Sequence, residues 1–214
     1  MTKGLTLGSF PALAMAFAIC GYATLAIYKV HESSVLLAQA APLTTNTSSS
    51  HTVGDLPDVA IETADGTHTS FAATAGKVRI ATMIYAHCPG VCPTTIEALR
   101  GIERGLTMEQ QDKLSVVLLS LDPTRDSPQA LQSFARERGI TSSRWLLGRT
   151  TSERDAQAFA SAVGLRFRPL SDGSIDHSTA LALIDARGRL LARASNAGET
   201  VEFVAAVRRA VSRQ

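Results

Sequence analysis

Cysteine is scarce in this 214-residue chain: Cys20, Cys88 and Cys92 are too few for a disulfide framework. Charge imbalance is also slight, since the formal net charge is only +2. Nucleic-acid binding requires a concentrated basic face, so this composition argues against it. Arginine is missing from residues 1–9, which excludes the Arg-rich, amphipathic segment that targets proteins to mitochondria.

Residues 10–28 form an apolar run without a charged side chain, and Lys29 closes it. A helix of this length spans roughly 28 Å, which is close to the hydrocarbon thickness of a bilayer. Lys3 and the terminal amine precede the run, so we expect residues 1–9 to be cytoplasmic. The sequence therefore predicts a single-pass anchor in a bacterial inner membrane, with the domain facing the periplasm.

Two alternatives compete with an uncleaved anchor. A signal peptide could be cleaved near Ala38-Gln39-Ala40, a small-residue triplet, and Cys20 could carry a lipid. The triplet is separated from the apolar run by charged residues, and Ile19 fits a lipoprotein signal poorly, so the anchor is favoured. Residues 29–51 follow as stalk and tether, since residues 39–50 are rich in Thr and Ser.

Residues 52–214 have the size of one domain with its own core, about 160 residues. Apolar runs and turn signals predict strands and helices in alternation. The fold class is therefore α/β, with helices flanking a central mixed sheet. The expected strands are 59–63, 78–85, 114–121, 179–185 and 190–194; the expected helices start near 93–95 or cover 128–138, 153–163 and 202–211.

Cys88 and Cys92 lie between a predicted strand and a predicted helix, at an edge of the sheet where ligands bind. A helix N-terminus favours thiolate over thiol, and a thiolate is both a nucleophile and a soft metal ligand. Structural zinc usually takes four protein ligands, whereas Cu(I) accepts fewer. The alternative is a structural disulfide between the two cysteines.

A histidine is the natural third ligand for such a pair. His31 and His51 fall in the stalk and tether, and His68 lies near the start of the domain. His87 adjoins the first cysteine, whereas His177 precedes a predicted buried strand. Spacing alone leaves His177 open between a ligand and a surface histidine at a strand edge.

Three ordered motifs make the sequence resemble the Sco/SenC family of membrane-anchored, thioredoxin-like copper proteins. Residues 85–93, YAHCPGVCP, resemble the family's C-P-x-x-C-P motif. Residues 120–128, SLDPTRDSP, resemble its S-x-D-P-x-R-D-[TS]-P loop, and residues 176–178, DHS, resemble its D-H-[ST] motif. Gly90 stands where the family often has Asp, which bears on metal affinity, the redox potential of the pair or docking to a partner.

The resemblance implies a thioredoxin-like fold and one copper ion per chain, Cu(I) or Cu(II), held by Cys88, Cys92 and His177. It also implies delivery of copper to the binuclear copper site of cytochrome c oxidase, or reduction of that site's cysteines. The implied partners are the copper-receiving oxidase subunit and other copper chaperones. The protein is thus expected to be a metal carrier rather than an enzyme.

The alternative function is an envelope thiol–disulfide oxidoreductase that uses Cys88 and Cys92 as its redox pair. Such enzymes typically place a proline opposite their cysteines, and residues 175–179 contain none. The context of a peroxidase cysteine is also missing. Asp126 and Ser127 are interpreted more simply, since either side chain suits the N-cap of the helix that follows.

Overall fold

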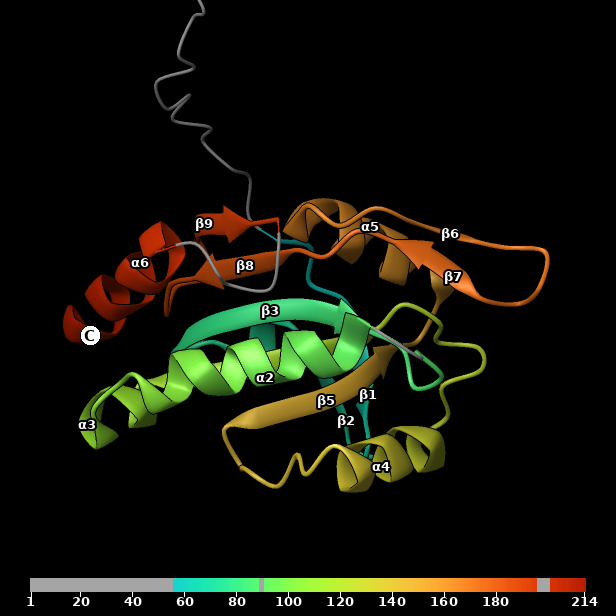
Figure 1. Ribbon diagram of the computed structural model, residues 1–214, viewed down its shortest axis with the longest axis horizontal. Helices are drawn as coiled ribbons and strands as arrows, with labels where there is room; N and C mark the ends of the chain where they lie inside the picture. Colours follow the sequence, from blue (N-terminus) through green and yellow to red (C-terminus); the bar gives the residue numbers. More distant parts are fainter. Residues whose placement is uncertain (1–55, 89–90, 196–200) are drawn as a thin grey trace, which may run out of the picture. The chain divides into compact units, whose positions relative to one another are not determined.

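The computed structural model describes residues 56–88, 91–195 and 201–214. Its centre is a seven-stranded sheet in the order β2-β1-β5-β4-β3-β8-β9, and β6 and β7 form a separate two-stranded sheet (Figure 1). The strands are β1 (Ala60–Thr63), β2 (His68–Ser70), β3 (Val78–Ile84), β4 (Leu114–Ser120), β5 (Trp145–Thr150), β6 (Phe167–Pro169), β7 (Ile175–His177), β8 (Leu181–Ile184) and β9 (Leu190–Ala194).

Strands β3, β4 and β5 are parallel, whereas β1 pairs antiparallel with β5 and β8 pairs antiparallel with β3. The predicted mixed sheet is therefore confirmed. Helices connect and cover these strands. They are η1 (Ala72–Thr74), α2 (Val91–Arg104), α3 (Met108–Asp112), α4 (Pro128–Glu137), α5 (Glu153–Val163) and α6 (Val201–Ser212).

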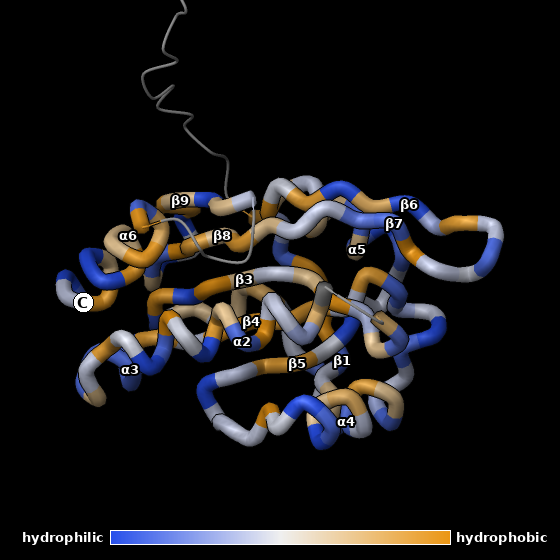
Figure 2. Tube along the Cα trace, viewed as in Figure 1, coloured by the Kyte–Doolittle hydropathy of each residue, from blue (hydrophilic) through white to orange (hydrophobic). Residues whose placement is uncertain are grey.

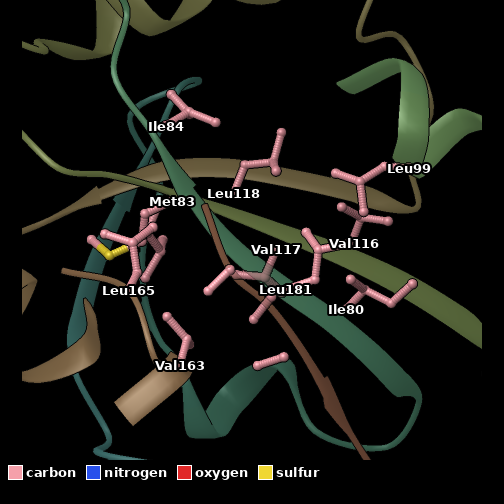
Figure 3. Close-up of a cluster of buried hydrophobic side chains, with 14 of the residues drawn as sticks. Ile80, Met83, Ile84, Leu99, Val116, Val117, Leu118, Val163, Leu165 and Leu181 are labelled. Atoms are coloured by element: carbon pink, nitrogen blue, oxygen red, sulfur yellow. The ribbon is translucent and has the colours of Figure 1, made fainter. Parts of the chain in front are cut away.

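Strand β3 is buried along its whole length, as a parallel strand covered on both faces must be. Figure 3 shows side chains of β3, β4 and β8 gathered in one apolar cluster, with Val163 and Leu165 beside it. Strands β6 and β7 differ from these core strands, since Figure 2 shows that they carry more hydrophilic residues than β8 does. The core therefore fixes β3, and with it the loop that follows β3.

Every predicted strand and helix of the domain is present, with small shifts at the ends. Helix α2 begins at Val91 rather than near 93–95, so Cys92 lies in its first turn. Helix α4 is capped by Ser127, whose hydroxyl accepts from the amide of Ala130, and Pro128 follows at its first position. Ser127, rather than Asp126, is therefore the N-cap.

Strand β5 was not predicted, although it lies between β1 and β4 inside the sheet. Its sequence, WLLGRT, interrupts the apolar run with Gly148 and Arg149. Gly148 is required by packing, because a Cβ there would lie 2.8 Å from both the carbonyl oxygen of Glu62 and the side chain of Ile61 on β1. Because β1 lies so close, position 148 must be glycine rather than an apolar residue. The apolar run that would have predicted a strand is therefore interrupted there.

The predicted anchor (10–28), stalk and tether lie outside the described residues. Among the residues that are described, the helices are all too short or too polar to cross a bilayer. Residues 52–214 form one compact unit, which carries the sheet and its helices.

Candidate metal centre

The loop after β3 presents the first cysteine. Cys88 is buried, and its amide donates to the carbonyl oxygen of Tyr85 at 3.1 Å, which closes a tight turn at the carboxyl end of the strand. Cys92 is also buried, and its amide donates to the sulfur of Cys88 at 3.3 Å. The first turn of α2 therefore directs a backbone N–H at the neighbouring sulfur, an arrangement that stabilises negative charge on it.

His177 comes from the other sheet, as the last residue of β7. Its ring packs edge-on against Tyr85, with ring centroids 5.7 Å apart and planes at 84°. Its Nδ1 lies 3.0 Å from the carbonyl oxygen of Ser178. Since a carbonyl only accepts, a neutral imidazole here donates from Nδ1 and keeps its lone pair on Nε2, which is the form a metal ligand needs.

Cys88, Cys92 and His177 converge: the ligand atoms that they offer all lie within 4.8 Å of one another. Neither Cys88 nor Cys92 is engaged in a disulfide. Two thiols and one imidazole form a soft donor set that suits Cu(I) better than a hard cation. Structural zinc usually has four protein ligands, whereas this group supplies three.

Burial changes the chemistry expected of Cys92. The sequence predicted that the helix N-terminus would lower the thiol pKa, but burial raises the pKa of Cys92 far above its usual value, with a further increase from the hydrogen bond to Cys88. That prediction was wrong because desolvation of a thiolate outweighs the helix dipole here. Without a metal, Cys92 is therefore protonated, and metal binding must displace its proton.

Asp126 supports the cysteine loop from behind. Its side chain is fully buried, and Oδ2 accepts both from the hydroxyl of Ser120 at 2.5 Å and from the amide of Ala86 at 3.0 Å. Its Oδ1 has no hydrogen-bond partner and lies 3.7 Å from Nδ1 of the exposed His87. Burial raises the pKa of Asp126, although the hydrogen bonds from Ser120 and Ala86 act to lower it. Asp126 thus ties the end of β4 to the residues just before Cys88.

Arg125, the preceding residue, supports the other half of the site. It forms an ion pair with Asp122 and donates from a terminal nitrogen to the carbonyl oxygen of Gly173 at 2.6 Å. Gly173 lies in the turn between β6 and β7, the hairpin that ends at His177. The motif at 120–128 therefore holds both the cysteine loop and the histidine hairpin, although none of its residues belongs to the converging group.

Each predicted site residue is thus accounted for. Cys88, Cys92 and His177 come together; His87 points toward Asp126 instead, and His68 lies on β2. Tyr85, Arg125 and Asp126 were not predicted to support the site. These residues do lie within the motifs at 85–93 and 120–128. The spacing of residues in the sequence, however, does not show which distant groups they contact in the fold.

Comparison with known proteins gives a single family. The SCO1/SenC family model matches residues 60–212. A curated protein from Stutzerimonas stutzeri is 32% identical over 119 residues, which cover 54% of this chain and 56% of that protein. The chain thus spans little more than half the length of this relative.

Solved structures give the same fold. BsSco, described as a member of the Sco family of cytochrome c oxidase assembly proteins with a disulfide switch, superposes with a TM-score of 0.63 at 20% identity. That match covers 75% of this chain and 95% of BsSco. ScoI of Bradyrhizobium japonicum, solved with copper bound, has a TM-score of 0.57 at 20% identity over 72% of this chain and 98% of its own. The central sheet and its helices are thus a thioredoxin-like fold.

Proposed function

Because the chain belongs to the SCO1/SenC family, we propose that it is a copper-binding assembly factor for cytochrome c oxidase that binds one copper ion through Cys88, Cys92 and His177. The observation that carries this proposal is the convergence of these three ligand atoms within 4.8 Å. Copper bound to ScoI of Bradyrhizobium japonicum, and the assembly role in the description of BsSco, support it.

The burial of the cysteines suits a carrier. When copper leaves, Cys92 regains a proton and becomes neutral, so the empty site does not have to keep a buried thiolate. A receiving protein takes the metal in the reverse sense, since its own thiols release their protons as they bind the ion. The proposed recipient is the copper-receiving subunit of cytochrome c oxidase, and other copper chaperones are the proposed source.

A copper titration tests the proposal. The reduced fragment from Thr52 is titrated with Cu(I) without oxygen, in competition with a chromogenic chelator. We expect one Cu(I) per chain, and loss of tight binding in Cys88→Ser and in Cys92→Ser. His177→Ala should lower the affinity by about two orders of magnitude, equivalent to about 2.7 kcal/mol.

His87→Ala is the matched control, since His87 neighbours Cys88 in sequence but lies outside the converging group. It should retain nearly full affinity. A metal-to-protein ratio near zero, or equal losses in the two histidine variants, would contradict the ligand set proposed here.

A second candidate is a thiol–disulfide oxidoreductase, favoured by the contact between the amide of Cys92 and the sulfur of Cys88. Oxidation of the two thiols would form one disulfide and release two electrons and two protons to an oxidised protein disulfide. The variant His177→Ala separates the candidates. An oxidoreductase should keep its exchange rate in this variant, whereas a copper carrier should lose metal.

We also propose that residues 10–28 anchor the chain in the bacterial inner membrane and that the domain faces the periplasm. The uncharged run supports insertion, and the positive charges of Lys3 and the terminal amine before it support the orientation. Fusion of a periplasm-dependent reporter enzyme after residue 214 should give an active reporter, and fusion before residue 1 should not. The opposite pattern would reverse the topology.

A further inference from the structure

A basic groove lies at the end of the domain away from the cysteines. Its volume is about 540 Å³, and four arginines line it: Arg187, Arg189, Arg209 and Arg213. The first two belong to the turn between β8 and β9, and the other two lie at the end of α6. Arg209 lies in the last turn of α6 and Arg213 directly follows the helix, so both place positive charge along the same wall of the groove.

The positive charge of the basic groove is poorly compensated. Asp185 supplies the only carboxylate side chain that lines it, within the part of the chain that the structure describes. That carboxylate already accepts from Arg189 at 2.8 Å and lies near the buried Arg79. Arg187, Arg209 and Arg213 therefore remain available to an anionic partner.

The groove is also partly apolar. Leu191, on the edge strand β9, is 48% exposed, and Val78 and Leu183 form part of the lining. Val78 and Leu183 are buried, so Leu191 is the exposed large apolar side chain of this lining. Arginines beside an exposed leucine suit the headgroup region of a membrane. A free small anion would need the arginines but would gain nothing from Leu191.

The position of the basic groove favours a membrane further. Strand β3 runs from Val78, in the groove, toward Cys88, so the groove and the candidate metal centre occupy opposite ends of the sheet (Figure 1). Leu56, where the described domain begins, lines a small neighbouring cavity together with Arg187. The described part of the domain therefore begins beside the basic groove.

We propose that the basic groove is a docking surface for anionic phospholipid headgroups. Arg187, Arg209 and Arg213 bind the phosphates, and Leu191 contacts the boundary between headgroups and acyl chains. Docked in this way, the domain has its cysteines directed away from the lipid. The proposal depends on insertion of residues 10–28, but it is independent of copper, so metal-free protein tests it.

The test uses the full chain, metal-free, in nanodiscs of phosphatidylcholine with or without phosphatidylglycerol. Amide hydrogen exchange reports on residues 185–191 and 206–213. We expect slower exchange in both segments with phosphatidylglycerol and no slowing with phosphatidylcholine alone. Because each arginine contributes about fivefold at an anionic surface, Arg187→Gln/Arg209→Gln/Arg213→Gln should weaken docking roughly a hundredfold and abolish the slowing.

The matched control removes the same charge elsewhere: Arg104→Gln/Arg136→Gln/Arg154→Gln, three exposed arginines outside the groove. This control variant should still show slower exchange with phosphatidylglycerol. Addition of 0.5 M salt should abolish the slower exchange in both the wild type and the control variant. Equal slowing in neutral and anionic nanodiscs would overturn the proposal, as would equal loss in both triple variants. Slowing by an acidic protein but not by phosphatidylglycerol would assign the groove to a protein partner instead.

Discussion

The variant Asp126→Ala tests whether the second motif holds the cysteine loop in place. The substitution removes the oxygen that accepts from Ser120 and from the amide of Ala86. Each buried donor left without a partner costs about 1–3 kcal/mol. The free energy of unfolding should therefore fall by about 2–5 kcal/mol, since some of the loss is offset by removing a buried carboxylate. Asp126→Asn keeps one carbonyl oxygen and should lose only about 1 kcal/mol.

The difference in the free energy of unfolding between the wild type and Asp126→Asn should change with pH in a direction that tests this explanation. Burial raises the pKa of Asp126 in the folded protein, so the folded state holds that proton more tightly than the unfolded state does. The resulting stabilisation is complete below the unfolded pKa, about 3.9, and is lost as pH rises through the folded pKa. Asn does not titrate, so the deficit of Asp126→Asn should be largest in acid and should shrink toward neutral pH.

Urea unfolding of the reduced, metal-free domain at several pH values measures both effects, and Cu(I) competition measures the effect on the site. Ser127→Ala is the control, because it removes a helix cap worth about 1 kcal/mol without touching the cysteine loop. Copper affinity should fall in Asp126→Ala and remain unchanged in Ser127→Ala. The reasoning fails if Asp126→Ala unfolds like the wild type, or if the deficit of Asp126→Asn grows with pH.

His177, the cysteine pair and Glu103 can each be tested by a single change. Copper affinity should be lower in His177→Ala than in the wild type, because one of the three converging ligands is missing; equal affinities in a competition titration would show that His177 is a surface histidine. Oxidation of Cys88 and Cys92 to a disulfide should be reversible by dithiothreitol and should block copper uptake, since ligation needs free thiolates; copper uptake by thiol-free protein, checked by thiol counting, would contradict this. Glu103→Ala should lower the free energy of unfolding by about 1–3 kcal/mol, because the carboxylate accepts from both Arg144 and the indole of Trp145; an unchanged urea midpoint would show that neither bond matters.

The fold could be predicted from the sequence where local patterns and tertiary packing agree. Strands such as β3 and β4 are uninterrupted apolar runs, and α4 carries its own start signals in Ser127 and Pro128. Strand β5 could not be predicted, because Gly148 is explained by the approach of β1, which is distant in sequence. The strand propensities of residues 145–150 alone do not indicate a contact with such a distant strand.

The candidate site was likewise predicted only in part from the sequence. The pairing of Cys88 with Cys92 follows from a short loop, but His177 is distant in sequence, and only the resemblance to a family singled it out. The pKa of Cys92 was mispredicted because the helix terminus is visible in the sequence and the depth of burial is not. The links from Asp126 and Arg125 likewise depend on which loops meet in space.

The division of the site between two sheets has a mechanical consequence. The cysteines are fixed to the large sheet through β3, whereas His177 belongs to the β6–β7 hairpin, which pairs only with itself among the described strands. A metal ion bound by all three residues is a crosslink between the core and this hairpin, and its departure leaves the hairpin held by the weaker links from Arg125 and Tyr85. If the protein carries copper as proposed, its metal-bound and metal-free forms would therefore differ in the stiffness of an exposed hairpin. A partner protein that contacts this hairpin would then distinguish the two forms without contacting the metal ion.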